Sequence, residues 1–125
     1  MKTCSCIKIF FSLMLCTQLA YAKSPCYKLA TTTFFDSSIS PTVSTPETLK
    51  DAKNEMADGE TFCKRVVQFI KTKGTTSEIV KTKAEEMLKE AKDEFEHDGD
   101  MDKLELAKYH YALTVGSAQI AEELP

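Results

Sequence analysis

Tryptophan is absent from the 125 residues of the sequence, and glycine and proline are scarce, with four residues of each. Without tryptophan, the indole side chain that often anchors a protein interface is not available. The glycines are separated from one another, which excludes the glycine-rich loops that bind phosphate or a dinucleotide. No Asn-x-Ser/Thr motif occurs, so we expect no N-glycosylation. The sequence thus carries no motif of a nucleotide-binding enzyme.

No apolar run approaches the about 20 residues that a membrane-spanning helix requires. A shorter apolar stretch, residues 9–16, follows the positive charges of Lys2 and Lys8 and precedes the small-x-small sequence at 20–22. This order is typical of a secretory signal peptide with its cleavage site. We therefore expect residues 1–22 to be removed and the mature protein to be secreted into the extracellular space.

Basic clusters are also lacking. Without Lys2 and Lys8 the chain has 14 basic and 19 acidic residues, a formal charge of −5. The basic residues alternate with carboxylates, as in residues 89–94, which is typical of a solvated helix face. An acidic chain without a basic patch is a poor candidate for binding nucleic acid or an anionic membrane. We expect neither partner, and no membrane span.

Two of the five cysteines, Cys26 and Cys63, lie outside the expected signal peptide. In an oxidising compartment they most simply form one intrachain disulfide. It would close a loop of about 38 residues and stabilise the fold by about 4 kcal/mol in the chain-entropy model. The alternative is an interchain disulfide in a covalent dimer. Neither cysteine belongs to a Cys-x-x-Cys motif, so a catalytic thiol is not expected.

Residues 23–45 are rich in serine and threonine and contain Pro25 and Pro41. These residue types favour turns or extended chain over helix. Apolar residues, Phe34 and Phe35 among them, are embedded in the segment. We therefore predict an extended arm that packs on the rest of the protein and is tethered through Cys26. The alternative is an unpacked tail that is open to O-glycosylation.

Residues 46–125 form the predicted helical domain. Thr45 is a good N-cap and Pro46 suits the first helical position, and apolar residues then recur every three or four positions as far as Ile70. Gly59 lies in the middle of this segment, where a glycine destabilises a helix by about 1 kcal/mol relative to alanine. The segment is therefore either one helix that tolerates Gly59 or two helices, with Asp58 capping the second.

Two further helices follow. Thr75 and Glu78 form a capping-box pattern for the second, and Asp98 with Gly99 ends it. Its apolar positions have helical spacing and are Ile79, Val80, Ala84, Met87, Leu88, Ala91 and Phe95. The last helix is predicted to begin after Asp100 and to run to about residue 122. The fold class is therefore all-α, a small bundle of three helices, or four if Gly59 breaks the first, with an extended N-terminal arm tethered by one disulfide.

The last helix is apolar on two sides. One stripe consists of Leu104, Ala107, Tyr111, Val115 and Ala118. A second stripe, about 170° away at 100° per residue, consists of Leu106, Tyr109, Leu113 and Ile120. Such a helix is either buried centrally or buries one side against something outside the chain. Three candidates could cover the second stripe: the arm, a second copy of the chain or an apolar ligand.

Metal and catalytic sites are not expected. Asp98, Asp100 and Asp102 have the spacing of the first calcium ligands in an EF-hand, but Lys103 and Tyr109 stand where that loop needs glycine and glutamate. A helix-capping turn explains the same aspartates. His97 and His110 have no partner at a short zinc-ligand spacing. We expect no catalytic residues, no metal and no cofactor.

The surplus of apolar side chains in so small a chain favours a binding role. We expect a small secreted non-enzymatic binding protein whose partner is a hydrophobic small molecule, another protein or a second copy in a homodimer. The expected ligand or partner face consists of Leu106, Tyr109, Leu113, Ile120, Phe34 and Phe35. The alternative is a secreted effector, hormone-like signal or toxin that acts on a receptor through its charged helix faces.

Overall fold

The computed structural model describes residues 24–37 and 45–124, and over these residues it contains four helices and no strand. The helices are α2 (Pro25–Asp36), α3 (Pro46–Lys71), α4 (Ser77–Asp98) and α5 (Met101–Glu123). The predicted all-α bundle is confirmed. The expected signal peptide, residues 1–22, lies outside the described residues.

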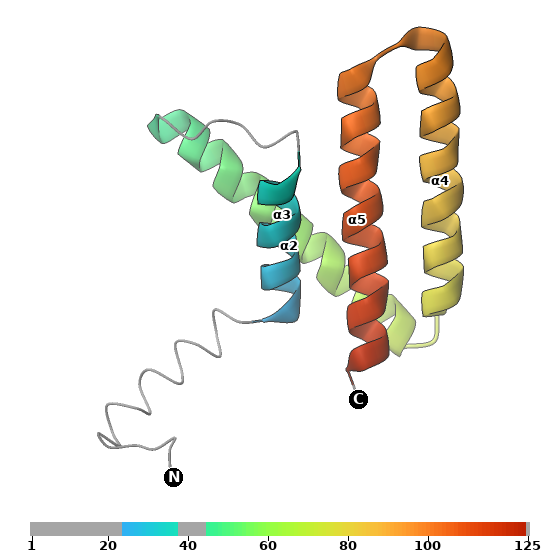
Figure 1. Ribbon diagram of the computed structural model, residues 1–125. Coiled ribbons are helices and arrows are strands. Elements are labelled where there is room, and N and C mark those ends of the chain that lie inside the picture. Colours follow the sequence, from blue (N-terminus) through green and yellow to red (C-terminus); the bar gives the residue numbers. More distant parts are fainter. Residues whose placement is uncertain (1–23, 38–44, 125) are drawn as a thin grey trace.

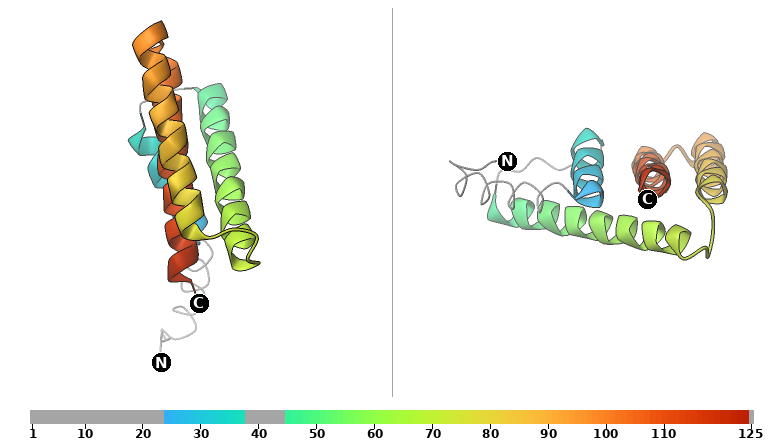
Figure 2. Two further views of the ribbon diagram at one scale, coloured as in Figure 1. Left: turned by 90° about the vertical axis from the view of Figure 1, so that its right-hand side faces the viewer. Right: turned by 90° about the horizontal axis from the view of Figure 1, so that it is seen from below.

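Helix α5 is the centre of the bundle. It runs antiparallel to α4, to which a short turn joins it (Figure 1). Seen from below, α2, α5 and α4 stand in a row with α5 in the middle, and α3 runs across one side of this row (Figure 2). Helix α5 accordingly packs against all three of the other helices. Its central position explains why two of its sides are apolar.

The segment predicted as an extended arm is helical over Pro25–Asp36. Ser24 caps α2 by accepting a hydrogen bond from the Tyr27 backbone N–H at 3.3 Å, and Pro25 occupies the first turn. Every fourth residue, Cys26, Ala30 and Phe34, is buried. This apolar spacing decides the structure, because burying one face of a helix outweighs the weak preference of serine and threonine for extended chain. Residues 38–44 of the predicted arm lie outside the described residues.

Helix α3 passes through Gly59 without a break. It begins as predicted, with the Thr45 hydroxyl accepting from the Thr48 backbone N–H at 3.2 Å and the Thr48 hydroxyl accepting from the Thr45 N–H at 3.0 Å. Gly59 is buried where α2 and α5 approach α3. A Cβ atom added there would lie 3.3 Å from both the Ala30 Cβ and the Tyr109 hydroxyl oxygen. The glycine therefore allows three helices to approach closely, and their packing offsets its low helix propensity.

The boundaries of α4 and α5 agree with the sequence to within two residues. The N-cap of α4 is Thr76, one residue later than predicted, and its hydroxyl accepts from the Ile79 N–H at 3.2 Å. Gly99, with φ of 66°, ends α4 in the left-handed conformation that favours glycine. Asp100 caps α5 as predicted, accepting from the Lys103 N–H at 3.1 Å.

A cluster of buried core residues lies between α2, α3 and α5. It consists of Phe34, Ala52, Tyr109 and Leu113. Beside it a disulfide joins Cys26 of α2 to Cys63 of α3, with a Cα–Cα distance of 5.5 Å. The predicted intrachain pairing is confirmed, and α2 is fixed to α3 both by packing and by a covalent bond.

Within the described ranges, no helix is both long and apolar enough to span a bilayer.

Candidate functional site

Half of the face predicted to bind a ligand or partner lies in the core. Tyr109 and Leu113 of α5 are buried against Phe34 of α2, with Ala52 of α3 beside them. Helices α2 and α3 thus cover the middle of the second apolar stripe of α5. These three predicted site residues stabilise the fold and are not accessible to a ligand in this structure.

The other half of that face is divided among separate places. Leu106 is exposed near the start of α5, and Ile120 is half-buried near its end. About 21 Å of helix separates them at 1.5 Å per residue. Phe35 is exposed on α2 and contacts the ring of Phe34 edge to face, with 5.5 Å between ring centroids. Leu106 and Ile120, near opposite ends of α5, do not form one compact surface.

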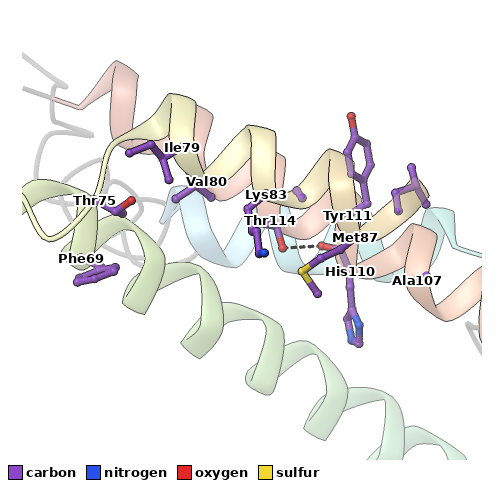
Figure 3. A pocket seen from close by; sticks show the side chains of 12 residues that line it. Phe69, Thr75, Ile79, Val80, Lys83, Met87, Ala107, His110, Tyr111 and Thr114 are labelled. Atoms are coloured by element: carbon purple, nitrogen blue, oxygen red, sulfur yellow. Dashed lines mark hydrogen bonds between the residues drawn. The ribbon is translucent and has the colours of Figure 1, made fainter. Parts of the chain in front are cut away.

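An apolar groove lies instead between α4 and α5, closed at one end by α3. We call it the α4–α5 groove. Its volume is about 320 Å³, within the range of small-molecule sites. Figure 3 shows the side chains that line it. They are Phe69, Thr75, Ile79, Val80, Lys83, Ala84, Met87, Leu88, Ala107, His110, Tyr111 and Thr114.

The groove exists because α4 is packed on one side only. Helix α4 packs chiefly on α5, whereas α3 packs on α2 and α5. Ala84 is the single buried residue of α4. Around it, Ile79 and Met87 of α4 and Phe69 of α3 are 60%, 59% and 56% exposed. The apolar stripe predicted for α4 is therefore present in the structure, but a large part of it is not covered by another helix.

The polar side chains of the groove come from both helices. Figure 3 shows Lys83, Met87 and His110 pointing to the same side of the α4–α5 pair, while Tyr111 points away. The Lys83 ammonium lies 3.8 Å from the Glu86 carboxylate, and both side chains are well exposed. The Thr114 hydroxyl donates to the backbone carbonyl of His110 at 2.7 Å. Lys83 is thus the charged group that a ligand in the groove would meet.

The aspartates of the α4–α5 turn act as caps, as the helix-capping interpretation proposed. The Asp98 carboxylate accepts from the Asp100 backbone N–H at 2.9 Å and from the Lys103 ammonium at 3.0 Å. The Asp100 hydrogen bond and, after it, the Lys103 ammonium hold the pKa of Asp98 below its ordinary value of 3.8. The same pairing raises the pKa of Lys103.

Histidines do not form a ligand set in this structure. The His97 ring lies 2.9 Å from the backbone carbonyl of Asp93, one turn earlier in α4, while His110 lines the groove. Across the described part of the chain, no three or more histidine, cysteine, aspartate and glutamate side chains gather where they could hold a metal ion.

The apolar positions of α4 are visible in the sequence, but the groove that they line is not. The helical spacing of Ile79 and Met87 was visible in the sequence, and so was Phe69 near the end of α3. Whether another helix covers these residues depends on the angle at which α3 crosses the bundle. No local pattern in the sequence determines that crossing angle.

Comparison of the chain with protein-family models, with curated proteins and with solved structures finds no match. The function must therefore be inferred from the groove and from the sequence.

Proposed function

We propose that the protein is a small secreted, non-enzymatic binding protein that holds an apolar ligand in the α4–α5 groove. The groove itself carries this proposal. It combines a volume of about 320 Å³ with three large apolar side chains, Phe69, Ile79 and Met87, each more than half exposed. Exposed apolar surface gathered around a concavity is typical of ligand sites, because a ligand that covers it releases water from both surfaces.

The disulfide and the N-terminal sequence support secretion. The Cys26–Cys63 bond is of the kind that forms and persists in oxidising compartments. The signal-peptide pattern of residues 1–22 directs a chain to such a compartment. A stable extracellular domain of about 100 residues would benefit from a covalent bond between its first two helices.

The chemistry of the lining supports binding rather than catalysis. A hydroxyl nucleophile needs a base within hydrogen-bond reach to activate it. The Thr114 hydroxyl donates instead to a backbone carbonyl, that of His110. The remaining lining is mainly aliphatic and aromatic, which suits a ligand held by its apolar surface.

Titration with the neutral fluorescent probe N-phenyl-1-naphthylamine tests the proposal. We expect saturable binding to the secreted protein with one site per chain. Ile79→Gln should weaken binding, because it places an amide in the groove wall. Leu106→Gln is the matched control, since Leu106 is an exposed leucine of α5 that does not line the groove. Both side chains are exposed, so we expect each change to alter stability by only about 0.5 kcal/mol or less.

Two results would overturn the proposal. One is the absence of saturable probe binding to the wild-type protein. The other is a dimer, detected by sedimentation velocity, that dissociates in Ile79→Gln but not in Leu106→Gln. That pattern would assign the groove to a second copy of the chain.

A further inference from the structure

We infer that the ligand of the α4–α5 groove is a single-chain amphiphile with a carboxylate headgroup, which binds beside Lys83 and His110. The inference rests on the proposed function and specifies its ligand class. It follows from the charge of the groove lining, the size of the groove and the placement of its polar groups.

The charge of the lining differs from that of the protein. The chain has 19 acidic residues against 16 basic ones, yet the groove is lined by one lysine, one histidine and no carboxylate. A cationic ligand would therefore find no opposite charge within the lining, whereas an anionic headgroup finds the Lys83 ammonium. The imidazole of His110 adds an N–H donor in either neutral tautomer.

The Lys83 ammonium is available to a ligand. Its ion pair with Glu86 has an N–O distance of 3.8 Å, and the two side chains are 71% and 60% exposed. Exposed pairs of this kind contribute little to stability, because water screens them and two flexible side chains must be ordered. A ligand carboxylate can therefore replace Glu86 beside Lys83 without a large loss of protein stability.

The size and layout of the groove favour a medium-length chain. At about 30 Å³, the volume of one water molecule in the liquid, 320 Å³ corresponds to about ten groups of that size, which suits an alkyl chain of medium length. In Figure 3, Phe69, Thr75 and Ile79 lie at one end, while Lys83 and His110 lie farther along. A carboxylate beside Lys83 would allow the alkyl chain to extend past Val80 and Ile79 toward the ring of Phe69.

Calorimetric titration with three probes that each have a ten-carbon chain tests the headgroup. They are decanoate, decanol and decyltrimethylammonium, which share a chain and differ in charge. The wild-type protein should bind decanoate about two- to fivefold more tightly than decanol, as expected for one exposed ion pair, and the cation least tightly. His110→Gln should weaken the binding of decanoate but not that of decanol.

Reversing one charge gives the sharper result. Lys83→Glu should invert the order, so that decyltrimethylammonium binds more tightly than decanoate. Lys89→Glu is the matched control, because it makes the same change in net charge on the same helix outside the groove lining, where Lys89 pairs with Asp93 at 3.2 Å. This control should retain the wild-type order. Circular dichroism would verify that both variants remain helical.

The experiments distinguish a failure of the carboxylate inference from a failure of the proposed binding function. If the wild-type protein and Lys83→Glu bind the three probes with equal affinity, the carboxylate inference is wrong and the apolar binding site stands. The same conclusion follows if Lys89→Glu changes the order as much as Lys83→Glu. If the wild-type protein binds none of these three probes but binds N-phenyl-1-naphthylamine, the inference alone is wrong. If it binds neither, the proposed function is wrong as well.

Discussion

The two sides of helix α5 are packed very differently. On one side, Tyr109 and Leu113 are buried against Phe34 of α2 and Ala52 of α3, and a disulfide fixes those two helices together. On the other side, Ala84 is the only buried residue of α4, and the α4–α5 groove stays open. The large buried side chains and the disulfide thus lie among α2, α3 and α5, while apolar surface remains accessible beside α4. Substitutions on the first side should therefore affect folding, and those beside the groove should affect binding.

The largest expected effect comes from Phe34 in the buried core. Phe34→Ala should lower the free energy of unfolding by about 3–5 kcal/mol, because it removes a fully buried ring and leaves a cavity. Phe35→Ala is the matched control, since the neighbouring ring is 53% exposed and should contribute far less. Urea unfolding followed by circular dichroism measures both. Equal losses for the two variants would contradict the described core.

Removing the disulfide should have the next largest effect. The double change Cys26→Ser with Cys63→Ser opens a covalent link across 37 positions of sequence and should lower the free energy of unfolding by about 4 kcal/mol at most in the chain-entropy model. Both cysteines are replaced so that no free thiol remains. Thermal unfolding with and without reductant measures the effect, and an unchanged melting temperature would show that the bond contributes nothing.

A smaller effect is expected from Tyr109 at alkaline pH. Burial, with the carboxylates of Glu55 and Asp58 nearby, raises the pKa of Tyr109 above its ordinary value of 10.0. The unfolded chain therefore loses this proton at lower pH than the folded protein does, and stability should decrease as pH rises above about 10. Urea unfolding between pH 9 and pH 11, roughly the range around the ordinary tyrosine pKa, measures the slope.

Tyr109→Phe should reduce that alkaline slope. Tyr27→Phe is the control, because Tyr27 is an exposed tyrosine of α2. A steeper or unchanged slope in Tyr109→Phe would contradict the assignment.

The smallest effect concerns Asp98 in the α4–α5 turn, outside the groove lining. Its pKa is lowered, so the interactions of the carboxylate stabilise the turn at pH above the ordinary value of 3.8 and are lost as pH falls through the lowered value. Asp98→Asn should make the melting temperature less sensitive to acid, and Lys103→Gln should do so in part. A wild-type acid profile in Asp98→Asn would show that the pairing with Lys103 contributes nothing measurable.

The presence of most helices and the residues that cap them could be predicted, because both depend on interactions between residues that are close in sequence. Thr45 and Asp100 cap their helices through hydrogen bonds that span three residues, and such spacings are visible in a sequence. The helical spacing of Cys26, Ala30 and Phe34 was equally visible. The serine and threonine residues of this segment favour extended chain, but the apolar spacing outweighs that preference in the folded protein.

The site depends on tertiary packing, which local patterns do not determine. Two apolar sides of α5 were correctly recognised, but the sequence left open which one another part of the chain would cover. Helix α2 and the close approach at Gly59 cover the side of Tyr109 and Leu113. The exposed apolar residues that line the groove belong instead to α4 and the end of α3, as with Ile79 and Phe69.

The disulfide also has a consequence for resistance to proteolysis. The bond closes residues 26–63 into a covalent ring that contains most of α2 and the larger part of α3. A single cut anywhere inside this ring leaves both new ends attached to the same molecule. Helix α2 would then stay over Tyr109 and Leu113 without an intact backbone connection to α3. Only a second cut or reduction of the bond would release it.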